Sequence, residues 1–352
     1  MNTSDYYSIG IDAHKRFCQV HVLHPNGETV WKGRINSDGY DTFADIAAKC
    51  GGPCKATFES SSNWHVLYDR LTVIENIDEV IMAHPLKVKL ICDAHLKNDK
   101  VDALHLAQLL RLGMIPPAHA TGPEGRYVKE LIRQRAVWVG MRTRVRNRTH
   151  RLLGACPDQV SLPQCTDLFG TRGMKAMRAL QLPEPHQLHL TQNLATLAEL
   201  KAKTDVLEKE LQHLCREKPE IKLLATMPGV GKVIACVISS EIDGIGRFPE
   251  KNHFIAYCGL VPGTHGSAGV FHQGRMIKAC NKWLKWAFIE AAWVAISNDA
   301  YFGEAFKAHR ARGKKPNTSI TIIARRMAQI AWSILRENRG YRPGPASFPA
   351  RS

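Results

Sequence analysis

The sequence contains no long hydrophobic run, which excludes a protein that crosses a membrane with helices. None of its apolar stretches approaches the roughly 20 residues that a transmembrane helix requires. The residues from Met1 to Asp5 have neither the basic nor the apolar region of a secretory signal peptide. Neither terminus carries an amphipathic Lys/Arg helix with a Trp or Phe face, which a membrane-surface protein would need. We therefore expect a cytoplasmic protein with no membrane partner.

Acidic residues are scarce relative to basic ones. The 352 residues include 32 Asp and Glu against 48 Lys and Arg, which gives a formal net charge of +16. This excess of positive charge favours a polyanionic partner, most simply nucleic acid. The length and the hydrophobic content of 44% are sufficient for two or three globular domains.

The ten cysteines lack the spacing of a zinc site or a disulfide framework. Cys50 and Cys54 are the only close pair, and no second Cys or His pair completes a set of four ligands. Several others lie inside apolar patterns, namely Cys18, Cys92, Cys236 and Cys258. We interpret the cysteines as small buried hydrophobic residues in a reducing compartment.

The first part of the chain has an α/β pattern. Strand-like alternation covers residues 6–12, 16–24 and 29–35, and further strands are predicted at 54–59 and 78–82. Helical periodicity covers residues 39–49, 63–74, 86–93 and 98–112. Three antiparallel strands followed by βα units are typical of a ribonuclease-H-like sheet.

The middle of the chain predicts two long helices. A helix over residues 126–153 has an apolar stripe formed by Tyr127, Leu131, Trp138, Met141, Val145 and Leu152. A second helix, 191–215, has leucines at heptad positions. We expect an antiparallel coiled coil, within or between chains, with the proline-rich residues 155–189 as an irregular loop at its tip.

These patterns divide the chain into four segments. Pro116-Pro117 ends an α/β domain over residues 1–117, and the coiled-coil region follows at 118–217. Residues 218–340 form a mostly helical C-terminal domain, with helices near 250–258, 276–297 and 318–338. The Pro-rich, basic residues 341–352 are expected to be disordered.

Four acidic residues are candidate metal ligands: Asp12, Glu59, Asp99 and Asp102. Asp12 and Glu59 each end an apolar strand, where α/β sheets build sites. Asp99 and Asp102 are three residues apart and share a helix face, although a solvated charge pattern is the alternative. Four carboxylates at one point repel one another unless a divalent cation neutralises them. Oxygen ligands suit Mg²⁺ or Mn²⁺, and phosphodiester chemistry follows from such a site.

The first long helix is a candidate nucleic-acid interface because its charges are almost all of one sign. A solvated charged face is the alternative, but too few acids are present for pairing within the helix. The candidate phosphate contacts are Arg133, Arg135, Arg142, Arg144, Arg146, Arg148 and Arg151.

Two glycine-containing segments are further candidates. Gly229, Gly231 and Lys232 fail the P-loop spacing, so they form either a phosphate-binding helix N-terminus or an ordinary tight turn. Ser267 lies in the Gly-rich segment 259–269, and a serine hydroxyl there is a possible nucleophile toward a phosphodiester, with an ordinary loop serine as the alternative. Cations that would surround the phosphate follow it, namely Arg275, Lys278, Lys282 and Lys285.

Together these motifs resemble the Piv-like insertion-sequence transposases with a DEDD signature. The resemblance rests on residues 10–15, 58–61 and 97–103 in the first part of the chain. It continues in the C-terminal part at 227–231, at 259–267 and at 274–281. The sequence departs from the family pattern at Asn98, Ala268, Cys280 and Lys285, and none of these departures removes a proposed catalytic atom.

The resemblance implies a RuvC-like ribonuclease-H fold whose four acids bind Mg²⁺, and Ser267 as a nucleophile that forms a transient phosphoserine link to DNA. It also implies an RNA-guided recombinase, in which a structured bridge RNA pairs with donor and target DNA. Dimers would assemble into tetramers and share composite active sites. The alternatives are a metal-dependent nuclease for branched DNA with water as nucleophile, and a nuclease-dead RNA- or DNA-binding scaffold.

Overall fold

A five-stranded mixed sheet dominates the first of two units in the computed structural model, which describes residues 5–36, 39, 41–61, 63–91, 99–267, 270–277 and 279–343. The chain separates into unit 1, residues 1–121, and unit 2, residues 122–352. Within the described ranges, no helix is both long and apolar enough to cross a bilayer.

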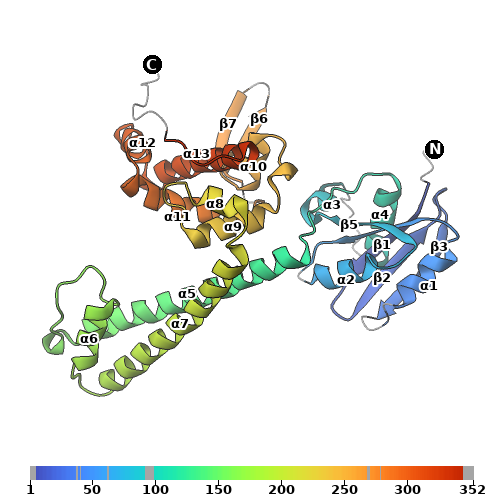
Figure 1. Cartoon of the computed structure of the whole chain (residues 1–352). Helices are drawn as coiled ribbons and strands as arrows, with labels where there is room; N and C mark the ends of the chain where they lie inside the picture. Colours follow the sequence, from blue (N-terminus) through green and yellow to red (C-terminus); the bar gives the residue numbers. More distant parts are fainter. Residues whose placement is uncertain are drawn as a thin grey trace. The chain divides into compact units, whose positions relative to one another are not determined.

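The sheet of unit 1 has the strand order β3-β2-β1-β4-β5 (Figure 1). Strands β1, β2 and β3 are antiparallel neighbours, whereas β4 and β5 run parallel to β1. The strands are β1 (Tyr7–Ala13), β2 (Phe17–Leu23), β3 (Thr29–Asn36), β4 (Cys54–Glu59) and β5 (Ile77–Ala83). The predicted mixed α/β fold is confirmed, and the arrangement fits a RuvC-like domain in general terms.

The two faces of this sheet are covered by different helices. Ile9 and Ile11 of β1 are buried in one cluster with residues of α1 (Asp41–Lys49) and α2 (Trp64–Leu71). Because side chains alternate along a strand, Gly10 and Asp12 belong to the opposite face. That face is covered by α4 (Asp99–Arg111), beside the shorter α3 (Pro85–Ile91).

Gly10 allows α4 to pack directly on β1. A Cβ atom at Gly10 would lie 2.2 Å from the carbonyl oxygen of Ala103 and 2.4 Å from the amide nitrogen of Ala107. Ala103 and Ala107 are themselves fully buried. A larger residue at any of these positions would push the helix from the sheet, so the small residues set the height of α4 above β1.

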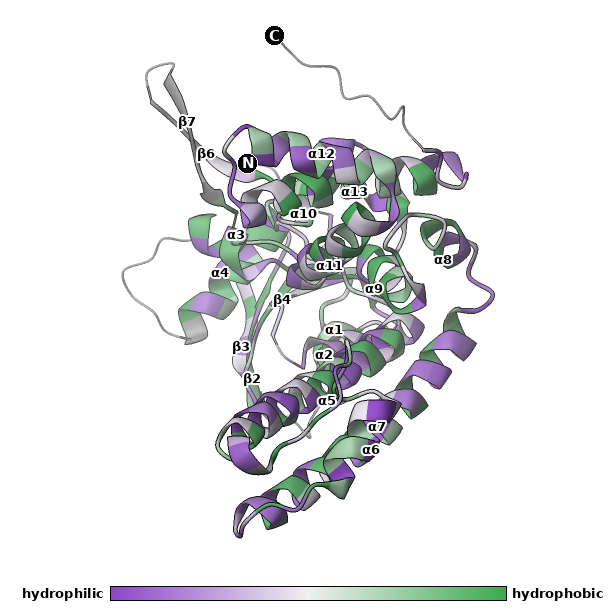
Figure 2. Cartoon of the chain, turned by 90° about the vertical axis from the view of Figure 1, so that its left-hand side faces the viewer, coloured by the Kyte–Doolittle hydropathy of each residue, from purple (hydrophilic) through white to green (hydrophobic). Residues whose placement is uncertain are grey.

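Unit 2 begins with two long antiparallel helices, α5 (Pro123–Gly154) and α7 (His186–Cys215), which lie side by side in Figure 1. Arg135 of α5 pairs with Glu208 of α7 at 2.6 Å, and Lys203 lies 5.0 Å from the ring centroid of Trp138. Contacts therefore move backward along α7 as they move forward along α5. Figure 2 shows hydrophilic residues along much of both helices.

The predicted apolar stripe of the first helix is partly wrong. Tyr127 and Met141 are 49% and 38% exposed, whereas the neighbouring Val128 and Ile132 are buried. The buried face changes along α5 because its beginning packs in the C-terminal core and its end packs in a separate cluster with α7. A single stripe cannot describe a helix that changes partners.

The segment 155–189 is not wholly irregular, since it contains the helix α6 (Thr171–Ala179) after a short 3₁₀ turn, η1 (Pro157–Gln159). The helix forms between Pro163 and Pro183, in a stretch without proline. Met177 is fully buried in the cluster that holds the tip of the α5–α7 pair together.

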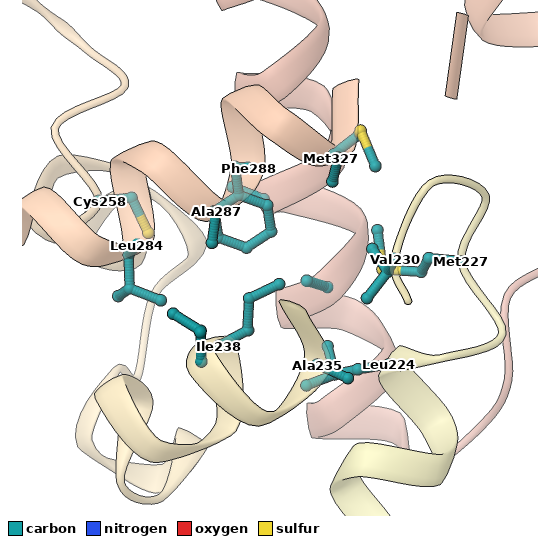
Figure 3. Close-up of a cluster of buried hydrophobic side chains, with 14 of the residues drawn as sticks. Leu224, Met227, Val230, Ala235, Ile238, Cys258, Leu284, Ala287, Phe288 and Met327 are labelled. Carbon is teal, nitrogen blue, oxygen red and sulfur yellow. The ribbon is translucent and has the colours of Figure 1, made fainter. Parts of the chain in front are cut away.

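The core of unit 2 is built mainly from the helices that follow α7, together with the beginning of α5 and the end of α7. Leu224, Ile238, Leu284, Phe288 and Met327 are among its buried side chains (Figure 3). Proline occupies the first turn of two of these helices, where its missing N–H costs nothing. The helices that follow α7 are α8 (Pro219–Leu224), α9 (Lys232–Ile242), η2 (Ile245–Arg247), α10 (Lys251–Tyr257), α11 (Lys282–Asn298), α12 (Ala300–Ala311) and α13 (Pro316–Glu337).

The Gly-rich segment is a hairpin in the structure rather than a loop. Strands β6 (Pro262–Ser267) and β7 (Val270–Met276) pair antiparallel, so the helix predicted from residue 276 begins only at Lys282. Its glycines and its proline, residue types that are depleted in strands, made this strand pairing hard to distinguish from a loop. Residues 344–352 of the predicted disordered tail, and Cys92, lie outside the described residues.

Candidate functional site

Asp12 and Glu59 lie at the same edge of the unit 1 sheet. β1 and β4 are adjacent and parallel, and Ile11 is in register with Phe58. Asp12 and Glu59 follow these partners directly. Neighbouring residues in register project to the same face of a sheet, so both carboxylates belong to the face that α4 covers. The strand order itself therefore supports the prediction that two strand ends converge.

Helix α4 brings Asp99 and Asp102 toward that edge. The hydroxyl of Tyr6, just before β1, donates to the carbonyl oxygen of Leu110 near the end of α4 at 2.9 Å. The first turn of α4 therefore faces the other end of β1, where Asp12 lies. Asp102 directly precedes Ala103, whose carbonyl oxygen is in contact with Gly10. The side chain of Asp99 lies outside the described residues.

His14 is a neighbour of this edge that the sequence pattern did not single out. Its Nε2 atom lies 3.1 Å from the Oδ2 atom of Asp12. Across the strand pair, burial and the Asp12 carboxylate together raise the pKa of the Cys18 thiol to about 11. The Cys18 thiol is therefore neutral, and it is buried in the cluster with Ile9 and Ile11 on the opposite face of the sheet from Asp12. His14 is placed to orient the Asp12 carboxylate.

The donor set suits a hard cation, because Asp12, Glu59 and Asp102 offer only carboxylate oxygens. Among the side chains that the structure describes, no three His, Cys, Asp or Glu groups already gather as a metal site. The acids fit Mg²⁺ in chemistry and in their common sheet edge. Metal binding at this edge stays a prediction.

Ser267 lies in unit 2, at the end of β6. It is in register with Val270, the first residue of β7, which places it at the far end of the ladder from Pro262 and Met276. Its side chain, the side chain of Arg275 and the whole of Lys278 lie outside the described residues. Lys282 is exposed and Lys285 half-buried in the first turn of α11.

The seven candidate arginines of α5 differ in their surroundings. Arg133 and Arg135 form ion pairs with Glu241 and Glu208, and Arg146 lies over the ring of Phe169 at 4.9 Å. These three guanidinium groups therefore contribute to packing within unit 2. The other four arginines are exposed or half-buried, namely Arg142, Arg144, Arg148 and Arg151.

Gly229 and Gly231 have different roles, although the sequence treats them alike. Gly229 has a φ of +78°, and a Cβ atom there would lie 2.1 Å from the carbonyl oxygen of Ala291. Gly229 therefore allows a tight turn that packs directly on α11. Gly231 has open space around it and precedes α9 without a side-chain cap. With the exposed Lys232, it is the part of this motif that remains a candidate for phosphate contact.

Lys129 on α5 gives a prediction about pH. Burial lowers the pKa of its ammonium group below the usual 10.5, although Glu241 and Asp243 oppose that shift. The charged form therefore reduces stability at neutral pH, and this cost disappears as pH rises through the lowered pKa toward the unfolded value. Lys129→Met should be more stable than the parent at neutral pH, and the difference should close at about pH 10.

The measurement is urea unfolding of both proteins at several pH values. Lys209→Met is the matched control, since Lys209 lies on an exposed position of α7. A parent that is more stable than Lys129→Met at neutral pH would contradict the prediction.

Comparison with known proteins identifies two family matches in separate parts of the chain. A transposase family defined by the DEDD motif of IS110-type elements matches residues 9–157. A second family, described as transposase IS116/IS110/IS902, matches residues 221–307. The first match contains all four candidate acids, and the second contains Ser267 and the Gly229–Gly231 turn.

Individual relatives support the same grouping. A probable family 20 transposase of Pseudomonas aeruginosa is 23% identical over 96% of this chain and 98% of its own length. The transposase for insertion sequence element IS1328 of Yersinia enterocolitica is 23% identical over 93% of this chain and 96% of its own length. A pilin gene-inverting protein of Moraxella bovis is 28% identical over 38% of this chain and 44% of its own length.

Proposed function

Because the chain belongs to the IS110 family of DEDD insertion-sequence transposases, we propose that it is an RNA-guided DNA recombinase acting through a transient phosphoserine. The observation that carries the proposal is the common sheet edge of the acids. Asp12 and Glu59 end adjacent parallel strands in register, and α4 begins at the same edge with Asp99 and Asp102.

Asp12, Glu59, Asp99 and Asp102 would hold Mg²⁺ or Mn²⁺ at this edge. A bound divalent ion supplies positive charge that polarises a phosphate and stabilises the charge of its transition state. The protein contributes the positions of the carboxylates, and His14 contributes a partner that orients Asp12. Small residues at Gly10 and Ala103 keep the helix and the strand close enough for this set to act together.

Ser267 would provide the nucleophile in unit 2. Its Oγ atom attacks the phosphorus atom, the P–O bond to one deoxyribose breaks, and the hydroxyl proton passes to the leaving oxygen. The phosphodiester is thereby retained as a serine ester. Attack by the hydroxyl of another strand then re-forms a diester and returns the proton to the serine, so the exchange needs no outside energy.

Basic surfaces would hold the nucleic acids. Net charge +16, the exposed arginines of α5 and the exposed Lys232 and Lys282 support phosphate contacts. We propose donor and target DNA together with a structured guide RNA as partners, and dimers that assemble into tetramers. RNA that copurifies with the chain and matches the DNA flanking its gene would test the guide.

The opposed helices α5 and α7 would form a coiled coil within the chain. The reversed order of their contacts supports this proposal, as does burial of the heptad residues Leu190, Leu197, Leu200, Thr204 and Leu211.

Replacing the acids tests the metal half of the proposal. Asp12→Asn and Glu59→Gln should each lower Mg²⁺-dependent DNA cleavage by roughly 100-fold or more, since a neutral amide no longer attracts the cation. Cleavage is measured over a Mg²⁺ titration, with the donor DNA flanking the gene as substrate and the copurified RNA present.

Glu79→Gln provides the matched control. Glu79 is an acid of the same sheet, but it pairs with Lys55 at 2.7 Å and lies partway along β5. It should cleave like the parent. Full Mg²⁺-dependent activity in Asp12→Asn and Glu59→Gln together would refute the metal site.

The alternative function is a metal-dependent nuclease that uses water. One observation favours it: the four acids belong to a single unit of the chain, so they require no group from unit 2. The two functions differ in whether a protein–DNA adduct forms.

A further inference from the structure

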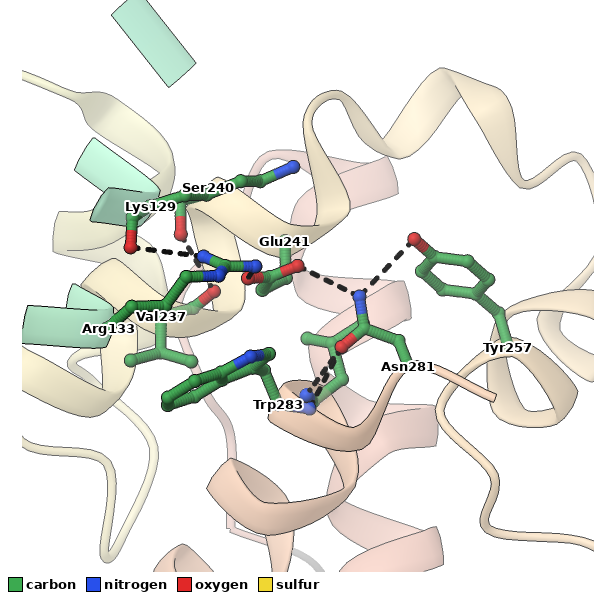
Figure 4. Close-up of polar contacts among 9 residues, drawn as sticks. Lys129, Arg133, Val237, Ser240, Glu241, Tyr257, Asn281 and Trp283 are labelled. Atoms are coloured by element: carbon green, nitrogen blue, oxygen red, sulfur yellow. Dashed lines mark hydrogen bonds and ion pairs between the residues drawn. The ribbon is translucent and has the colours of Figure 1, made fainter. Parts of the chain in front are cut away.

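A buried carboxylate in unit 2 contacts side chains from two other elements, and these contacts lie near the base of the β6–β7 hairpin. Figure 4 shows the contacts. Glu241, near the end of α9, is only 3% exposed. One of its oxygens, Oε1, accepts from the guanidinium of Arg133 on α5 at 2.8 Å. The other, Oε2, accepts from the side-chain amide of Asn281 at 2.9 Å. Glu241 could have been noticed in the sequence as an acid within a largely apolar helix. It was missed because charge patterns were considered only along α5.

Asn281 has its orientation fixed by the helix that it caps. Its Oδ1 atom accepts from the backbone amides of Trp283 and Leu284 at 3.0 Å each, in the first turn of α11. Its Nδ2 atom must therefore point away from the helix, toward Glu241 and the hydroxyl of Tyr257. Both groups that face Glu241, the guanidinium and the amide NH₂, are donors only.

Only an ionised carboxylate satisfies this arrangement. A glutamine in place of Glu241 would present one oxygen and one NH₂, so it would satisfy either Arg133 or Asn281 and leave two donors facing each other. The site therefore selects Glu for its two acceptors as well as for its charge.

The same residues close the base of the β6–β7 hairpin. The backbone amide of Asn281 donates to the carbonyl of Tyr257 at 2.8 Å, and that of Ile277 donates to the carbonyl of Val261 at 3.3 Å. Pro262 and Met276 form the first pair of the ladder. Asn281 therefore connects the base of the hairpin to the end of α9, through Glu241, and to the end of α10, through Tyr257.

The hairpin acts as an arm with Ser267 far from its base. The five steps from Pro262 to Ser267 span roughly 16 Å at about 3.3 Å per residue. A tilt of about 5° at the base would move Ser267 by about 1.4 Å. A displacement of about 1 Å at a reacting group is enough to lower a rate about 100-fold.

We propose that Glu241 is a positioning residue that sets the direction of the β6–β7 hairpin, and with it the place of Ser267, through Asn281. Arg133 links this setting to the basic helix α5. The inference rests on the proposed role of Ser267, although its structural part can be tested alone.

A pair of compensating substitutions tests the proposal in the full-length chain. Glu241→Gln leaves the Asn281 amide facing a donor, and Asn281→Asp leaves two carboxylates facing each other. The double variant restores every contact. The oxygen of the introduced glutamine accepts from Arg133, and its NH₂ donates to the introduced aspartate, which still caps α11.

Hydrogen exchange provides the first readout and needs no substrate. In each single variant the amides of Ile277 and Asn281, which donate the hydrogen bonds at the hairpin base, should exchange about tenfold faster, the loss of about one hydrogen bond, while those of α13 stay protected. The double variant should return these rates to those of the parent. Faster exchange throughout unit 2, or no change at these two amides, would overturn the inference.

Recombination provides the second readout, measured as excised circle junctions from a plasmid that carries the gene with its native flanks. Each single variant should fall about 100-fold, and the double variant should recover at least tenfold of that loss. No recovery despite restored exchange rates would show that Glu241 does not act by positioning. An active Ser267→Ala variant would instead refute the proposed function and leave the exchange result standing.

Discussion

Ser267→Ala is expected to form no covalent protein–DNA adduct and to lower recombination at least roughly 10⁴-fold, the scale seen when a catalytic nucleophile is removed. The substitution deletes the hydroxyl oxygen that would bond to phosphorus. It leaves the backbone pairing of Ser267 with Val270 in place, so the hairpin should still form. The loss should therefore be chemical and not a loss of fold.

The measurement uses end-labelled donor DNA and the copurified RNA, and adducts are detected on a denaturing gel. Ser297→Ala is the matched control, since Ser297 is an exposed serine near the end of α11 in the same unit. A variant that lacks the adduct but cuts DNA at the parent rate would favour the nuclease with water as nucleophile. An undiminished adduct in Ser267→Ala would place the nucleophile elsewhere.

Gly229→Ala should destabilise unit 2 by about 2–4 kcal/mol. The new methyl group would lie 2.1 Å from the Ala291 oxygen and 2.8 Å from the Ala295 nitrogen, on a helix face with no exposed surface. The residue would also keep a φ of +78°, which costs about 1 kcal/mol for alanine. Overpacking against backbone adds about 1–3 kcal/mol.

Gly231→Ala is the control within the same motif. No atom lies within 4 Å of a Cβ at Gly231, and its φ is −77°. Its cost should stay below about 1 kcal/mol, the usual range for an N-cap change. Urea unfolding followed by tryptophan fluorescence measures both variants. Equal stability of the two would mean that the turn does not pack on α11 as the structure has it.

Strand ends and residue spacing carried much of the unit 1 prediction. Asp12 and Glu59 were recognisable because each ends a short apolar strand. The parallel register of β1 and β4, which the structure gives, places their side chains on a common face. The spacing of Asp99 and Asp102 indicated one helix face. Pattern reading cannot, however, tell which end of the helix meets which end of a strand. The contacts of Tyr6 with Leu110 and of Gly10 with Ala103 decide that.

Predictions for unit 2 succeeded less often because its elements change partners. The stripe through Tyr127 and Met141 assumed one neighbour for the whole of α5, whereas the structure provides two. The Gly-rich segment was predicted to be a loop because its local propensity for strand is low. The strand forms because it pairs with a partner strand, which local propensity does not reveal. The arginines of α5 looked equivalent, yet Arg133 and Arg135 have acidic partners far away in sequence.

The sequence by itself determined the chemistry available to this protein: carboxylates for a hard cation, a serine among cations, and a strongly basic surface. These depend on residue type and local spacing, which a linear chain already contains. Only the tertiary structure decided which groups act together. It assigned Gly229 to packing and left Gly231 open, and it buried Glu241 between two donors. Such roles arise from contacts between residues distant along the chain, and no local pattern records them.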